Sequence, residues 1–199
     1  MSTRRQTAIP RNSSRQSRIA GNRSRDLSYP TLFLYSTGAR ISEALSLNPH
    51  DVDLSRGTVT FRGSRANRRR TIPIGANLVQ RLREYAIARG AMASDHENFF
   101  VRENGTAIRR VAVSVNFQTL RRKAGLSRPK NIFRQPRVQD LRRTFAVHCM
   151  REWLKRGKDL RTMLPILGAY LGHVSLTSTE AYLAVTPERF STQLLSLGE

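Results

Sequence analysis

The sequence predicts a mainly helical domain with a small antiparallel β-sheet, which is an α+β fold. Apolar residues recur at helical spacing through most of the chain beyond its N-terminal segment. Only two short segments that precede the longer helices alternate as a strand pair does, and a basic turn separates them. The predicted elements do not follow the strand–helix–strand order that would indicate a parallel sheet. At 199 residues the chain is long enough for one sizeable core.

Two segments of different composition divide the chain. Residues 1–27 are rich in Ser, Arg, Asn and Gln and contain almost no large apolar side chains. Such a segment buries too little surface to offset its conformational entropy, so we predict a basic, disordered arm. We predict that residues 28–199 form the folded domain.

The folded domain begins with an apolar segment that a glycine interrupts. Residues 29–35 are apolar and aromatic, Gly38 breaks the pattern, and Ile41, Leu45 and Leu47 continue at helical spacing. We therefore expect helical structure that is interrupted at Gly38.

A β-hairpin with a strongly basic tip is predicted next. Residues 58–61 and 71–74 alternate as strands, and the Gly and Asn between them suit a turn. Guanidinium groups bind phosphate through paired hydrogen bonds, so the arginines of this segment are candidate DNA contacts. Those that we assign to DNA binding are Arg62, Arg68, Arg69 and Arg70.

The rest of the chain is predicted to be largely helical. An amphipathic helix that includes Leu78 ends near Gly90, and a short strand and turn follow at residues 99–105. Helical periodicity then returns in residues 111–124, 141–154, 160–171, 176–183 and 187–195.

Charge limits the class of partner. A formal net charge of +21 at pH 7 attracts polyanions, and phosphate neutralisation by Arg and Lys supplies much of the affinity of DNA-binding proteins. An RNA-binding structural protein would carry the same charge, so charge alone leaves both nucleic acids open.

Cysteine use and hydropathy indicate the compartment. The single cysteine, Cys149, excludes an internal disulfide and a zinc site made of several cysteines, and it fits a reducing cytosol. No run approaches the ~18 apolar residues of a membrane span, and no apolar signal region follows the first residue. We expect a cytoplasmic protein without a membrane partner.

Four side chains that suit phosphodiester chemistry occur along the chain. Arg40 lies in the segment GARISEAL, and Arg142 lies in the segment DLRRTFA. His173 ends the triplet LGH, and Tyr182 follows nine positions later. Each residue alone also has an ordinary structural explanation: an arginine paired with Glu43, a histidine near a helix end, or a half-buried core tyrosine.

The order and spacing of these residues resemble the tyrosine recombinase (phage integrase) family, whose catalytic domain carries Arg, Lys, His/Lys-x-x-Arg, His and a nucleophilic Tyr in that order. The resemblance covers roughly residues 28–199 and implies the fold of that catalytic domain. It implies site-specific DNA recombination or integration for a mobile genetic element, through a 3′-phosphotyrosine intermediate at Tyr182. Arg40 and Arg142 would clamp the phosphate, and His173 would donate to a phosphate oxygen or assist proton movement at the phenol.

The resemblance also implies the partners. Because the phosphotyrosyl link stores the bond energy, rejoining needs no ATP, and the resemblance implies neither a metal nor another cofactor. The implied substrate is double-stranded DNA, bound by a homo-oligomer in a tetrameric synapse. The apolar segment after Tyr182 either docks on a neighbouring protomer, as in the family, or folds back on its own core.

The chain departs from the family pattern at two site positions. Arg65 stands where the family has a hairpin lysine, the general acid for the departing 5′ oxygen. An arginine, with a pKa above ~12, releases a proton poorly. Gln139 stands where the second box has His or Lys, and an amide donates a hydrogen bond but exchanges no proton. We include both in the catalytic set and predict slowed chemistry.

The sequence leaves three other interpretations open. Arg65, Gln139 and the absence of the family's N-terminal helical domain from this sequence favour a DNA-binding remnant that holds recombination-site DNA without cutting it. Since phosphate and base contacts would be lost with that domain, weaker and less selective binding is expected. Type IB topoisomerases share the chemistry, and an RNA-binding protein fits the charge.

Overall fold

The computed structural model describes residues 27–63, 69–91, 97–126, 135–173, 175 and 177–182. Nearly all of the predicted N-terminal arm, the hairpin tip with Arg65 and Arg68, and the predicted helix at 187–195 lie outside the described residues. The described part is mainly helical with one three-stranded antiparallel sheet, which confirms the α+β prediction.

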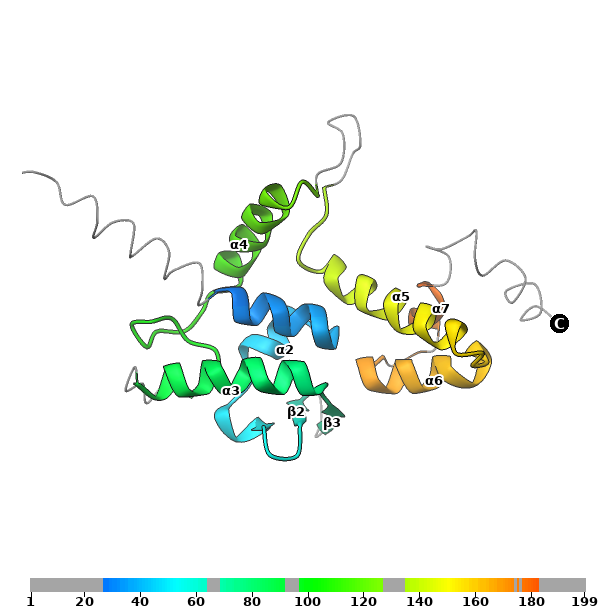
Figure 1. The fold of residues 1–199 in the computed structure, drawn as a ribbon, viewed down its shortest axis with the longest axis horizontal. Coiled ribbons are helices and arrows are strands. Elements are labelled where there is room, and N and C mark those ends of the chain that lie inside the picture. Colours follow the sequence, from blue (N-terminus) through cyan, green and yellow to red (C-terminus); the bar gives the residue numbers. More distant parts are fainter. Residues whose placement is uncertain are drawn as a thin grey trace, which may run out of the picture.

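The described elements begin with a helix over residues 27–37, and the chain turns at Gly38 as predicted (Figure 1). The later elements are α2 (Ile41–Leu45), η1 (Pro49–Asp51), β1 (Val52–Asp53), β2 (Thr58–Arg62), β3 (Arg69–Pro73), α3 (Ala76–Ala91), α4 (Arg110–Lys123), α5 (Asp140–Lys155), α6 (Leu160–Leu171) and α7 (Thr177–Glu180). Among these described helices, none is long and apolar enough to cross a membrane.

The sheet has the order β1-β2-β3, and both neighbouring pairs are antiparallel. Val59 faces Ile72 across β2 and β3, and Phe61 faces Arg70. Val59, Phe61 and Ile72 are buried, so one face of the hairpin packs into the core. The predicted hairpin is confirmed, whereas β1 was missed because a two-residue strand has no alternation to detect.

The buried apolar residues form two clusters. One joins the first helix, the sheet and α3 through residues such as Phe33 and Val59. The other lies between α5 and α6 and includes Met150 and Leu167. Tyr170 packs against both clusters.

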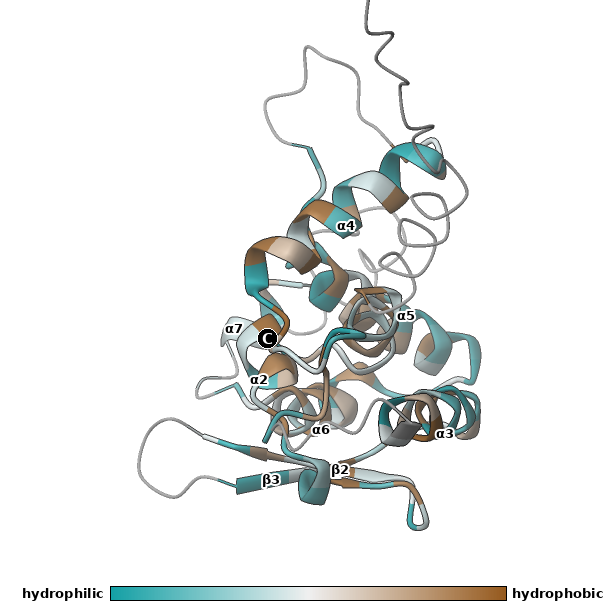
Figure 2. Ribbon diagram, turned by 90° about the vertical axis from the view of Figure 1, so that its left-hand side faces the viewer, coloured by the Kyte–Doolittle hydropathy of each residue, from teal (hydrophilic) through white to brown (hydrophobic). Residues whose placement is uncertain are grey.

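In Figure 1, α5, α6 and α7 lie on one side and α2, α3 and the sheet on the other. Figure 2 shows hydrophilic and hydrophobic residues mixed along α3 and α4, as amphipathic helices require.

Gly38 allows the two halves to approach each other. It lies between the first helix and α2 with a φ of +62°, a conformation that glycine adopts without steric cost. A Cβ at this position would lie 2.6 Å from Cδ1 of Phe145 and 2.9 Å from Cδ2 of Leu171. The absence of a side chain therefore lets α5 and α6 pack directly on this turn.

Candidate active site

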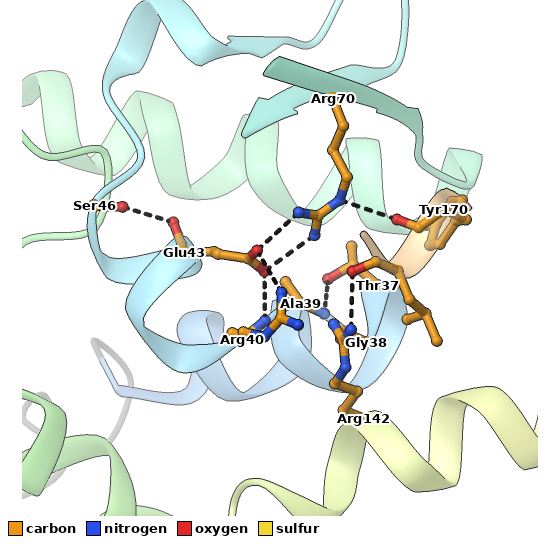
Figure 3. A network of polar contacts seen from close by, with 10 residues as sticks. Thr37, Gly38, Ala39, Arg40, Glu43, Ser46, Arg70, Arg142 and Tyr170 are labelled. Carbon is orange, nitrogen blue, oxygen red and sulfur yellow. Dashed lines mark hydrogen bonds and ion pairs between the residues drawn. The ribbon is translucent and has the colours of Figure 1, made fainter. Parts of the chain in front are cut away.

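Arg40 lies immediately before α2 and is held by the residue three positions later. The carboxylate of Glu43 accepts a hydrogen bond from the backbone N–H of Arg40 at 2.8 Å and another from its Nη1 at 3.2 Å (Figure 3). This capping box satisfies a free N–H at the start of the helix. The Arg40 side chain remains 48% exposed. Its ion pair with Glu43 therefore leaves the guanidinium accessible to a ligand.

Arg142, in the first turn of α5, bridges two parts of the chain. Its Nη1 donates to the carbonyl of Gly38 at 2.8 Å, and its Nη2 donates to the carbonyl of Leu171 at 2.9 Å. Burial and the nearby charge of Arg40 lower the pKa of Arg142, while a hydrogen bond with Tyr182 acts in the opposite direction. The guanidinium of Arg142 therefore lies close to Arg40 and Tyr182, and it contacts Leu171, two residues before His173.

Arg70, on β3, has three of its donors occupied within the protein. Nη1 and Nη2 donate to the two carboxylate oxygens of Glu43 at 2.7 and 3.0 Å, and Nε donates to the carbonyl of Tyr170 at 3.1 Å (Figure 3). Its guanidinium also lies 4.4 Å from the centre of the Phe61 ring, a cation–π contact. Arg70 and Arg142 thus bind two consecutive carbonyls that the end of α6 leaves without helical partners.

His173 follows the C-terminal turn of α6. Gly172 adopts the left-handed conformation with φ +71°, and the N–H of His173 donates to the carbonyl of Gly168 at 2.9 Å, which ends the helix in a Schellman motif. The Nδ1 atom of His173 lies 2.7 Å from Oγ1 of Thr179. Burial, followed by the charges of Arg142, Arg40 and Arg70, lowers the pKa of His173 to about 4. The imidazole is therefore neutral at pH 7.

Tyr182 follows α7 and lies beside His173. The centres of the two rings are 5.7 Å apart, and the N–H of Tyr182 donates to the carbonyl of Thr179 at 3.0 Å. The tyrosine is half-buried and lies close enough to Arg142 to raise the pKa of that guanidinium against the lowering effect of burial. The structure thus brings Arg142, His173 and Tyr182 together, with Arg40 close enough to influence the pKa of both Arg142 and His173.

The remaining predicted site residues have different positions. Gln139 is exposed at the N-terminal end of α5, one turn before Arg142. Arg62 donates through Nε to the buried carboxylate of Asp51 at 2.8 Å, and its Nη2 forms an ion pair with the same oxygen at 2.8 Å. Arg69 is exposed, and Arg65 and Arg68 lie outside the described residues. The DNA-binding assignments of these hairpin arginines stay predictions.

Two residues of the site were not assigned a role from the sequence. Glu43 joins Arg40 to Arg70, and the Arg-x-x-Glu spacing at a helix start was the signal for its capping role. Thr179 contacts both His173 and Tyr182, and nothing in its sequence context distinguishes it from the other small residues near it.

The site is rich in cations. The guanidiniums of Arg40, Arg70 and Arg142 lie around Glu43, so their positive charge exceeds the negative charge of this carboxylate. An anion that enters would meet hydrogen-bond donors fixed by other contacts. Within the described residues no group of three or more His, Cys, Asp or Glu side chains is placed to hold a metal ion.

The mainly helical fold with its small antiparallel sheet thus brings arginine, histidine and tyrosine side chains together in one site. The family model described as "Phage integrase family" matches residues 12–189, and the chain belongs to this family. The resemblance seen in the sequence is thereby confirmed.

Curated relatives carry related names. A "Putative integrase/recombinase y4rB" of Sinorhizobium fredii is 32% identical over 169 residues, covering 82% of this chain and 54% of that protein. "Tyrosine recombinase XerC" of Chlamydia pneumoniae is 33% identical over 154 residues, covering 76% of this chain and 45% of the relative. The chain thus spans about half the length of the curated relatives it matches.

Solved structures share the fold. The crystal structure of XerA recombinase has a TM-score of 0.64 at 23% identity, covering 92% of this chain and 61% of that one. The post-cleavage complex of XerH recombinase with palindromic difH substrate has a TM-score of 0.66 at 23% identity, covering 88% of this chain and 46% of the other. At these identities the likeness establishes the fold.

Proposed function

We propose that this chain is the catalytic domain of a site-specific DNA recombinase, or integrase, of a mobile genetic element, which cleaves and rejoins DNA strands through a 3′-phosphotyrosine at Tyr182. The observation that carries the proposal is the convergence of a half-buried tyrosine, the nearby guanidinium of Arg142 whose pKa it influences, and a neutral histidine with its ring centre 5.7 Å from the tyrosine ring. The family membership supports the same reaction.

The arginines supply the electrostatic part of the mechanism. As a nucleophile approaches phosphorus, negative charge increases on the non-bridging oxygens, and donors already fixed in position stabilise it. Arg142 is fixed by Gly38 and Leu171, and Arg40 by Glu43, so neither needs to reorganise when the phosphate arrives. Removal of one such donor costs about 10²–10³ in rate in other enzymes that transfer acyl groups.

The covalent step is a direct transfer of the phosphoryl group. The phenolic oxygen of Tyr182 forms a bond to phosphorus and gives its proton to water or to a neighbouring base. The bond from phosphorus to the 5′ oxygen breaks, its electron pair stays on that oxygen, and a proton from a neighbouring acid completes the 5′ hydroxyl. Attack by a 5′ hydroxyl on the phosphotyrosine reverses the step, so rejoining requires no external energy source. His173, neutral at pH 7, provides an N–H or a lone pair near these oxygens.

The proposed partner is double-stranded DNA, bound by a homo-oligomer in a tetrameric synapse. The net charge of +21 supports binding to a polyanion, and the XerH structures are described as complexes with difH substrate. We place the protein in the cytoplasm, where DNA is available. Hairpin residues Arg62, Arg68, Arg69 and Arg70, and Gln139 on α5, remain candidate contacts or catalytic groups in this proposal.

One specific observation favours a second function. Arg65 and Gln139 stand where the resemblance to the family implies proton-exchanging residues. A protein with these replacements that binds recombination-site DNA without cutting it would retain Arg40 and Arg142 as phosphate ligands. Chemistry and binding must therefore be measured separately.

The test uses a duplex with a nick that lets the short cleaved fragment diffuse away, so that rejoining is blocked. The core site is first selected from a randomised duplex library by binding to the protein. A covalent protein–DNA band that survives boiling in detergent, disappears after protease treatment and is absent with Tyr182→Phe supports the enzyme. Arg65→Lys and Gln139→His are expected to strengthen it. No band from wild type or from either variant, on DNA that all of them shift in a gel, would leave the binding function.

A further inference from the structure

Thr179 contacts both residues that flank the proposed reaction centre. It belongs to α7, and its side chain is fully buried. Its hydroxyl oxygen lies 2.7 Å from Nδ1 of His173, and its carbonyl accepts the backbone N–H of Tyr182 at 3.0 Å. One residue therefore connects the histidine to the tyrosine.

Packing fixes the position of this hydroxyl. A Cβ added at Gly168 of α6 would lie 3.0 Å from Oγ1 of Thr179, which is tighter than an ordinary contact. The hydroxyl thus lies directly against the backbone of α6, which also presents its Gly168 carbonyl to the N–H of His173. Because α6 determines the positions of both groups, the distance between Thr179 and His173 follows from helix packing.

The contact with Nδ1 determines what the other ring nitrogen can do. A neutral imidazole has one N–H and one lone pair, and the partner of one nitrogen selects the role of the other. Since Thr179 occupies Nδ1, Nε2 is the nitrogen left for substrate. The non-bridging oxygens of a phosphodiester only accept hydrogen bonds, so a useful ring must carry its proton on Nε2.

We propose that Thr179 is a positioning residue whose hydroxyl donates to Nδ1 of His173, fixing the imidazole in the tautomer with its proton on Nε2 and holding it beside Tyr182. The consequence for cleavage rests on the proposed recombinase function. The tautomer itself is a property of the protein without DNA.

The first arm of the test is spectroscopic and needs no activity. The full chain is labelled with ¹⁵N-histidine, and the shifts and couplings of the two ring nitrogens of His173 are measured at pH 7 without DNA. We expect the Nε2–H tautomer in wild type and in Thr179→Ser, which keeps the hydroxyl. Thr179→Val has nearly the same shape but lacks the donor, and we expect it to show a mixture of tautomers. A proton on Nδ1 in wild type, or a valine variant with the wild-type tautomer, overturns the proposal.

The second arm measures cleavage and DNA affinity. We expect Thr179→Val to reduce the cleavage rate constant about tenfold, the effect of one hydrogen bond to the imidazole, with unchanged affinity for DNA. Thr179→Ser should restore the rate; a serine variant as slow as valine would assign the effect to the methyl group and overturn the role of the hydroxyl.

Stability and activity failures remain separable from this result. Should the valine variant not fold, the tautomer measured in wild type still tests the proposal. Gly168→Ala supplies a second perturbation, because its Cβ would press on the same hydroxyl. Should wild type form no phosphotyrosine while showing the expected tautomer, the proposed function fails and the positioning role stands.

Discussion

Arg70 of β3 and Glu43 of α2 form a two-pronged ion pair, with N–O distances of 2.7 and 3.0 Å. The side chains are only 20% and 16% exposed, so water screens this pair less than a surface pair. The same carboxylate orients Arg40, and the same guanidinium binds the end of α6 at Tyr170. The hairpin is therefore tied to the proposed phosphate site through a single carboxylate.

We predict that Arg70→Ala lowers the free energy of unfolding by about 2 kcal/mol, because it leaves Glu43 partly buried with one cationic partner and removes a donor from the end of α6. Urea denaturation measures the change. Arg69→Ala is the matched control, since Arg69 is the neighbouring residue on β3 but is exposed, and its loss should stay within about 0.5 kcal/mol. Equal effects of the two variants would contradict the structural role of Arg70.

The pH dependence of stability should contain a contribution from Glu43. Burial alone would raise the pKa of this carboxyl, but hydrogen bonds from Arg70 and from the N–H of Arg40, together with both charges, lower it below the ordinary 4.5. A carboxyl with a lowered pKa stabilises the fold fully above 4.5, and this stabilisation is lost as the pH falls through the lower folded value. Denaturation at a series of pH values, with Glu43→Gln as comparison, should show a smaller loss below pH 4.5 for the variant. Parallel curves would refute the prediction.

His173 should contribute in a separate pH window. Because burial and neighbouring arginines lower its pKa from 6.5 to about 4, the unfolded chain takes up a proton first as the pH decreases. Stability therefore falls between pH 6.5 and about 4 from this group and then levels off. An NMR titration of the imidazole should give a midpoint near 4, and Arg142→Gln should move it upward. A midpoint at the ordinary value in wild type would contradict the burial and charge environment described above.

The sequence predicted the helices, the hairpin and four side chains that suit one chemistry, because helical spacing, strand alternation and the order of Arg40, Arg142, His173 and Tyr182 are all local or ordered signals. It did not predict how those side chains are held. Arg70 was assigned to DNA binding from its place in a basic run, and its pairing with Glu43 depends on residues 27 positions apart that only the folded chain brings together. That assignment is untested, but much of its guanidinium is already occupied.

Thr179 illustrates a second limit of sequence patterns. Its role depends on the burial of one hydroxyl between α6 and α7, and a threonine among small polar residues is typical of an exposed helix end as well. The strand β1 was not predicted for a different reason: two residues are too few to show an alternating pattern. The short strand expected within residues 99–105 is only an isolated bridge between Val101 and Ala107. Local patterns thus predicted the longer described helices and the β2–β3 hairpin, whereas contacts between distant segments determine the geometry of the site.

Gly38→Ala should damage both the fold and the site. A Cβ at φ +62° costs roughly 1 kcal/mol, and its overlap with Phe145 and Leu171 adds about 1–3 kcal/mol unless α5 and α6 move. Because the Gly38 carbonyl holds Arg142, any such movement also displaces a proposed phosphate ligand. We expect urea denaturation to show a loss of about 2 kcal/mol or more, together with weaker formation of the covalent DNA complex.

Gly90→Ala is the control for this substitution. Gly90 lies within α3, and an added Cβ there meets no atom within 4 Å. Alanine at a helical position of this kind should stabilise the protein by roughly 0.5–1 kcal/mol, because the unfolded chain has fewer conformations to lose. The two glycine-to-alanine changes are therefore predicted to have opposite signs. A Gly38→Ala protein that is as stable as wild type would show that α5 and α6 do not pack on this turn as closely as their side-chain distances indicate.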